Sequence, residues 1–175
     1  ISALLCTFFA IFINFSVRYK KNNVLKFLSS FLTVGYAVPG IILAIGVMQL
    51  LTFIDSRVIG ENIQFILTGS LIGLIIAYII KSYALASSTI DSGYQRVNMR
   101  LDDVAKTLKT SGWSLLSSVH LPLLKTSFLT SVLLVISEVI KELPATLILR
   151  PFNFETLAVY TYIFAAEERM YDAAA

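Results

Sequence analysis

Long stretches without a charged residue are the feature that most constrains how this chain folds. Residues 1–17 and 62–80 contain no Asp, Glu, Lys or Arg, and residues 27–54 form an uncharged run of 28 residues. A helix needs roughly 20 predominantly apolar residues to cross the hydrocarbon core of a bilayer. A soluble domain of 175 residues could not bury this much apolar surface, because 57% of its residues are hydrophobic and only 14% are charged. We therefore expect an integral membrane protein.

Four membrane-spanning helices and a partial C-terminal element are predicted. The predicted spans are residues 1–17, residues 27–54, residues 62–80 with an extension to residue 85, and residues 121–140. The partial element covers residues 156–166. The predicted fold class is therefore all-α, a polytopic transmembrane helix bundle formed by one domain over residues 1–175.

The basic residues are distributed unequally between alternate connections of the predicted spans. Ten Lys and Arg residues fall in one set of connections and four in the other, against three and eight acidic residues. Because Lys and Arg near the ends of spans collect on the cytoplasmic side, the first set is predicted to be cytoplasmic. The long connection of residues 86–122 then faces the cytoplasm, and residues 141–169 lie at the outer side.

Small residues recur at every fourth position of the predicted third span. Gly69, Gly73 and Ala77 would share one helix face, which lets a second helix approach closely. The alternative is that glycine is simply common in membrane helices. We expect a packing interface within the bundle or a dimer.

A proline and a charge cluster indicate a translocation path. Pro39 and Gly40 interrupt the second span, and a proline there must kink or break the helix. Glu138, Lys141 and Glu142 end the fourth span, and charged groups at membrane depth usually face a bundle interior or an aqueous cavity. The structural alternatives are a plain kink and an interfacial ion pair between Glu138 and Lys141.

The cytoplasmic connection carries an amphipathic helix. Four apolar residues are spaced four, three and four positions apart: Val97, Leu101, Val104 and Leu108. That spacing places them on one stripe, and a second short helix follows at residues 113–120. A nucleic-acid partner is not expected, since the loop is tethered to the membrane at both ends and has little excess positive charge. A helix lying on membrane lipid and a docking element for a soluble partner are the two interpretations.

Residues 103–122 resemble the signature of the permease subunits of binding-protein-dependent ABC importers. That signature is Glu-Ala-Ala, a Gly six residues after the Glu, and Ile-x-Leu-Pro ten residues after the Gly. The matching positions of this chain, with one nearby glycine, are Asp103, Val104, Ala105, Lys109, Gly112, Val119, Leu121 and Pro122. Lys109 departs most, because the family's Gly permits the turn between two helices; Gly112 is the alternative place for that turn.

Two further stretches are similar to the permeases of ferric iron importers. They are residues 141–158 and residues 36–41, so the matches together extend over most of the chain. Those permeases are often two fused copies of one unit, and this chain is more like the second copy without its last span. We therefore expect the sequence to be a fragment of a longer protein.

The resemblance implies a fold, partners and a mode of action. It implies a type I, MetI-like permease core in the bacterial inner membrane, with residues 86–122 as a coupling loop in a cleft of a separate ABC ATPase subunit. It also implies an extracytoplasmic solute-binding protein and a second permease unit, as a fused copy or a dimer partner. ATP would be bound by the ATPase, because this chain has no G-x-x-x-x-G-K-[ST] loop. Ferric iron is the implied solute, and thiamine or polyamines are the alternatives.

Chemistry by this chain itself is not expected. Cys6 and His120 are its only cysteine and histidine, and no cluster with metal-ligand spacing or nucleophile–base pair is visible. We predict no cofactor bound by the chain, no metal site and no enzyme activity. The alternative from another class is a stand-alone channel or ion-coupled transporter, which would need neither an ATPase partner nor a docking stripe.

Overall fold

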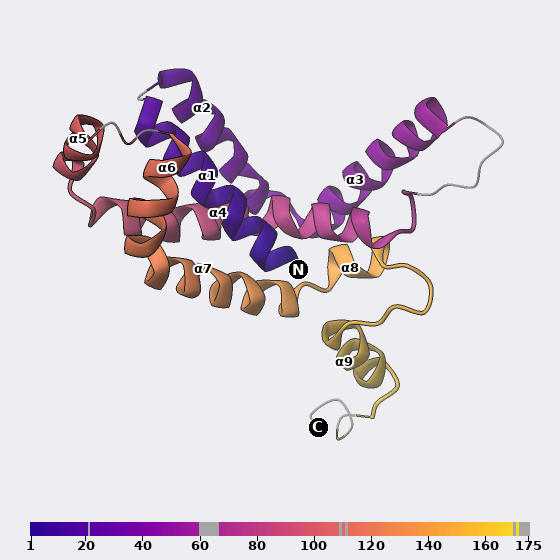
Figure 1. The fold of residues 1–175 in the computed structure, drawn as a ribbon. Helices are drawn as coiled ribbons and strands as arrows, with labels where there is room; N and C mark the ends of the chain where they lie inside the picture. Colours follow the sequence, from indigo (N-terminus) through magenta and orange to yellow (C-terminus); the bar gives the residue numbers. More distant parts are fainter. Residues whose placement is uncertain (21, 60–66, 109, 111, 170, 172–175) are drawn as a thin grey trace.

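The computed structural model describes residues 1–20, 22–59, 67–108, 110, 112–169 and 171. Within those ranges the chain is helical and has no strand, which confirms the all-α prediction (Figure 1). Four helical segments are long and apolar enough to cross a membrane: α1 (Ser2–Lys20), Gly40–Arg57, α4 (Leu71–Gln95) and Trp113–Lys141. The predicted number of spans is confirmed for the described part of the chain.

Helices α1, α4 and α7 (Leu121–Lys141) form the main packed core. Their contact surface contains small buried side chains, among them Cys6, Ala10 and Ala86. Small residues let helix backbones approach closely in a membrane, where lipid provides no hydrophobic drive for association. A hydrogen bond between Thr7 Oγ1 of α1 and Ser131 Oγ of α7, 3.2 Å long, crosses the same interface.

The second predicted span is broken into two helices. Helix α2 (Asn23–Leu32) continues into a 3₁₀ turn, η1 (Thr33–Ala37), and α3 (Gly40–Ile54) begins after Pro39. The break that the proline predicted is therefore confirmed. In Figure 1, α2 runs beside α1 whereas α3 lies along the other end of α4. Gly35 permits the crossing, because a Cβ there would lie 2.5 Å from the carbonyl oxygen of Ile80 in α4.

The third span lies further along the chain than its uncharged run indicated. Ser70 caps the helix, since its side chain accepts a hydrogen bond from Ile72 N, and α4 then continues through Lys81 to Gln95. Residues 60–66 lie outside the described residues. Gly69 precedes the helix with φ 84°, so the prediction that it shares a helix face with two other small residues is wrong.

The other two small residues do lie where α4 meets α3. Ala77 is fully buried, and a Cβ on Gly73 would come within 2.7 Å of Leu51 Cδ1. Together with the short helix α8 (Pro144–Leu149), α3 and α4 enclose a second, smaller apolar cluster. The chain then turns and ends its described part with α9 (Leu157–Ala166), which projects away from the bundle and corresponds to the predicted partial element (Figure 1).

Candidate docking surface and intramembrane ion pair

Helix α5 (Met99–Thr107) turns an apolar face away from the bundle. The side chains of Leu101, Val104 and Leu108 are 43%, 56% and 73% exposed, and we call these three residues the docking stripe. Val97, predicted as the fourth member, instead packs half-buried against the main core. An exposed apolar stripe on an amphipathic helix is what a helix that binds into a groove presents.

The eight residues predicted to match the signature of the coupling loop differ in how exposed they are. Four of them are exposed: Asp103, Val104, Leu121 and Pro122. Ala105 is buried and Val119 is half-buried, both in contact with the main core. Gly112 has φ 57° and ψ −125°, a conformation that requires glycine, so the turn lies at this alternative position. Lys109 lies outside the described residues.

The second helix of the loop is continuous with the fourth span. Helix α6 (Trp113–Leu115) passes through a π-helical turn, η3 (Leu116–His120), directly into α7. A displacement of this segment must therefore displace the N-terminal end of α7. His120, at the junction, is 1% exposed.

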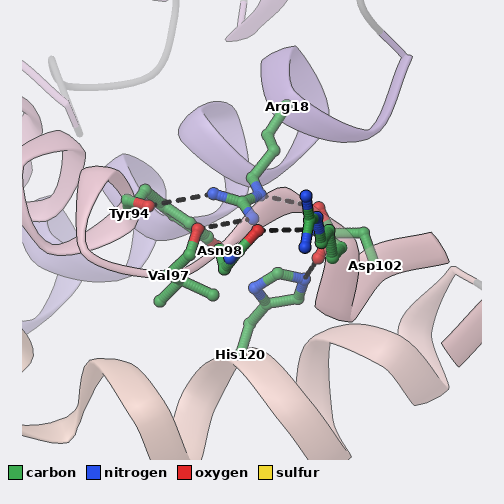
Figure 2. Close-up of polar contacts among 7 residues, drawn as sticks. Arg18, Tyr94, Val97, Asn98, Asp102 and His120 are labelled. Atoms are coloured by element: carbon green, nitrogen blue, oxygen red, sulfur yellow. Dashed lines mark hydrogen bonds and ion pairs between the residues drawn. The ribbon is translucent and has the colours of Figure 1, made fainter. Parts of the chain in front are cut away.

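The inner face of α5 is held by a charged contact that the sequence did not indicate. Asp102 accepts a hydrogen bond from Arg18 Nε over 2.7 Å, and His120 Nε2 lies 3.2 Å from its other carboxylate oxygen. Figure 2 shows Arg18 and His120 approaching Asp102 from two different helical segments. No sequence motif links these residues, because Arg18 and Asp102 are 84 positions apart.

A second charged contact lies within the spans. Lys81 Nζ of α4 is 2.5 Å from Glu142 Oε2, at the link between α7 and α8, and the two side chains are 18% and 8% exposed. Gly40, the first residue of α3, lies directly beside them: a Cβ there would be 2.5 Å from Glu142 Oε1 and 3.2 Å from Lys81 Nζ. The structure thus brings Gly40 and Glu142 together.

The ion pair differs from the Glu138–Lys141 pair that the sequence left open as an alternative. Among the described residues no ion pair joins Glu138 to Lys141; Glu138 is half-buried and Lys141 is exposed. Lys81 falls in the predicted extension of the third span, and the structure places it inside α4. Glu142 compensates its charge, so Lys81 does not have to end the span.

Hydrogen bonds fix Glu142 in place. Its carboxylate accepts from Ala145 N over 3.3 Å, and its carbonyl oxygen accepts from Thr146 Oγ1 over 2.5 Å. Because that hydroxyl hydrogen is already used, Tyr78 donates the 2.6 Å hydrogen bond that joins its hydroxyl to Thr146. Both carboxylate oxygens therefore have partners, as a charge in an apolar surrounding requires.

A groove of about 610 Å³ lies between α1, α2 and α4, lined by polar and apolar side chains. Its polar lining consists of Asn14, Lys26, Ser29, Ser30, Thr33, Tyr36, Ser87, Ser88 and Asp91. Helix α2 turns its apolar residues Val24, Phe27 and Phe31 to the outside, where they are 63%, 70% and 64% exposed. Polar residues of α2 thus line the groove while these apolar residues lie outside it. A helix that faces lipid has its apolar residues outside in this way, whereas a helix on the surface of a soluble protein has them inside.

Known proteins that are similar to this chain are membrane components of transport systems. The family described as "Binding-protein-dependent transport system inner membrane component" matches residues 6–165. The chain is 29% identical over 131 residues to a Haemophilus influenzae protein named as a ferric transport system permease, covering 75% of this chain and 19% of that protein. It is 28% identical over 109 residues to proteins of Salmonella typhimurium and Salmonella choleraesuis named as 2-aminoethylphosphonate transport system permeases, covering 62% of this chain and 41% of each. The chain thus spans less than half the length of these curated relatives.

Proposed function

Because the chain belongs to the family of binding-protein-dependent transport system inner membrane components, we propose that it forms the solute path of an ABC importer and couples it to a separate ATPase. The family consists of transport permeases and not of enzymes, and the chain is a multi-pass inner-membrane protein.

The observation that carries the proposal is the outward orientation of the docking stripe. Leu101, Val104 and Leu108 are exposed on a helix that connects two spans on the side richer in Lys and Arg. Covering such a stripe is favourable, by about 25 cal/mol per Å² of apolar surface removed from water. The exposed charges Arg100 and Asp103 flank the stripe and would fix the register of a partner that has complementary charges. An ATPase subunit with an apolar, charge-rimmed cleft is the partner that fits.

The mode of action follows from that contact. ATP bound by the partner would move α5, and α5 would move the spans between inward-facing and outward-facing arrangements. A ligand or partner can shift such an equilibrium only through contacts that differ between the two states, and the docking stripe offers such contacts. An extracytoplasmic solute-binding protein would deliver the solute, and a second permease unit, fused or separate, would complete the path.

The path is proposed to pass the Lys81–Glu142 pair and the groove between α1, α2 and α4. Pro39 directly precedes α3 and leaves Gly40 against the pair, so the break in the second span coincides with the charged site. Broken helices at membrane depth occur where neighbouring groups or a water-filled path satisfy the backbone. Glu138, half-buried on the same helix end, is the remaining candidate for the path.

Ferric iron is the proposed solute, supported by the name of the Haemophilus relative and by the stretch at residues 141–158. A second candidate is 2-aminoethylphosphonate, favoured by the names of the Salmonella relatives. Uptake of both compounds, measured in cells with and without the gene, separates them. Iron uptake that is indifferent to loss of the gene would remove the iron proposal.

The coupling proposal is tested with the variant Asp103→Arg. The new charge at the edge of the docking stripe is expected to weaken ATPase binding and to uncouple ATP hydrolysis from uptake, while membrane insertion stays intact. Ser118→Arg is the matched control, because Ser118 is an exposed residue of η3 outside the docking stripe. Normal uptake by Asp103→Arg, or uptake by the unaltered protein without any ATPase, would favour the stand-alone transporter instead.

A further inference from the structure

We propose that Arg18 and Asp102 form the mechanical link through which α5 moves the spans α1, α4 and α7. The inference rests on the proposed function, since it assumes that an ATPase displaces α5. Asp102 lies between Leu101 and Asp103 in the sequence, both of which are exposed, so it is one residue from the surface that the ATPase would hold. Arg18 and Asp102 are positioning residues in this scheme and contact no solute.

Arg18 joins three helical segments with one side chain. From the last turn of α1, its Nη1 donates to Tyr94 O over 2.9 Å and its Nη2 to Val97 O over 3.0 Å, while Nε donates to Asp102. Tyr94 lies in the last turn of α4 and Val97 two residues beyond the helix, at the end where the helix dipole favours a cation. Three donor atoms of the guanidinium are therefore used (Figure 2).

The link is shielded from water. The side chains of Arg18 and Asp102 are 10% and 14% exposed, and the guanidinium carbon lies 5.5 Å from the centre of the Tyr94 ring. A charged pair with little water around it is stronger and more rigid than an exposed pair. A displacement of α5 is therefore transmitted to Arg18 and not absorbed by a mobile side chain.

Asp102 is also contacted from the fourth span. His120, the residue before α7, approaches its second oxygen and packs between the rings of Phe15 and Tyr94, with ring centres 5.3 and 5.4 Å away. Arg18 of α1 and His120, just before α7, thus meet at one carboxylate of α5, and the end of α4 is joined to it through Arg18. The three spans of the main core would move together when this carboxylate moves.

The link requires an arginine and not simply a positive charge. Lysine is a flexible point charge that cannot hold Asp102 and two carbonyl oxygens in one planar arrangement. We therefore expect Arg18→Lys, in the intact transporter with its ATPase, to lower uptake about tenfold per assembled complex, which corresponds to one lost charged hydrogen bond. ATPase binding and ATP hydrolysis should continue, because the docking stripe is unchanged.

The matched control is Arg96→Lys. Arg96 follows α4 at the same side of the membrane, is exposed and makes no side-chain hydrogen bond or ion pair within the described residues. Its substitution should leave uptake per complex unchanged. The double variant Arg18→Asp with Asp102→Arg adds a second measurement, and partial recovery relative to Arg18→Asp alone is expected because the opposite charges meet again.

Each outcome decides the proposal. Uncoupling by Arg18→Lys, with the complex still assembled, supports the link. Unchanged uptake overturns it, and so does a loss of uptake that only follows a loss of assembled complex, which would make the pair a structural contact. If the unaltered protein binds no ATPase, the proposed function fails, and this result is distinct from any behaviour of the Arg18 variants.

Discussion

The two charged contacts of the molecule differ in how much of the fold depends on them. Arg18 and Asp102 meet between α1 and α5, at the edge of the bundle, and Arg18 also donates to two backbone carbonyl groups. Lys81 and Glu142 meet inside the spans, and they leave no room for a side chain at Gly40. The first contact spreads one cation over three acceptors, whereas in the second each charge depends mainly on the other.

That difference predicts which contact tolerates change. A charge left alone at membrane depth loses its main compensation, since the Lys81 and Glu142 side chains are only 18% and 8% exposed. A charge left alone near the membrane surface recovers part of its hydration. We therefore expect variants of the Lys81–Glu142 pair to affect stability most, and variants of the Arg18–Asp102 pair to affect coupling more than stability.

The largest effect is expected for Glu142→Ala. It leaves Lys81 unpaired within α4, and removing one partner of a buried ion pair costs about 3–5 kcal/mol. Thermal unfolding of the purified protein in detergent measures the change. Glu138→Ala is the control, since Glu138 is half-buried and has no ion pair among the described residues. Equal melting temperatures for the two variants would show that the Lys81–Glu142 pair does not stabilise the fold.

A smaller loss is expected for Gly40→Ala. The added Cβ would stand 2.5 Å from Glu142 Oε1, so the pair or the start of α3 must shift, at about 1–3 kcal/mol for an overpacked site. Gly46→Ala is the matched control in the same helix, because a Cβ there meets no atom within 4 Å. The control should be neutral or slightly stabilising. If Gly40→Ala unfolds at the control's temperature, the close approach is not as the structure has it.

Asp102→Asn is expected to have a still smaller effect on stability. The amide can keep one hydrogen bond to Arg18 but loses the charge, which costs about 1.5 kcal/mol. Asp91→Asn is the control, since Asp91 is exposed and its only side-chain hydrogen bond in the described structure, 2.8 Å long, comes from Gln95. A stability loss as large as that of Glu142→Ala would contradict the proposed difference between the two contacts.

The smallest effect on stability is expected for Val104→Ser. The Val104 side chain is 56% exposed, so the free energy of unfolding should change by no more than about 0.5 kcal/mol. Binding of the ATPase should nevertheless fall, because the substitution removes apolar surface from the middle of the docking stripe. Val119→Ser is expected to give the opposite result. Val119 packs against the main core, so this substitution should lower the stability of the protein more than its binding to the ATPase.

Several elements could be predicted from the sequence because they depend on neighbours along the chain. The spans follow from the lengths of apolar runs, the break at Pro39 from the geometry of one residue, and the docking stripe from residues three and four positions apart. The partner of Lys81 could not be predicted in this way. The predicted third span extends past Lys81, but Glu142, which compensates its charge, is 61 positions away.

The amino-acid order thus sufficed for the class of protein, the number of spans and the exposed stripe of α5, since each is a local property of composition and periodicity. The partners of Lys81, Glu142 and Arg18 became known only when the helices were packed together. Charges at membrane depth pair with whichever opposite charge the packing brings within reach, and that depends on contacts between segments far apart in the chain.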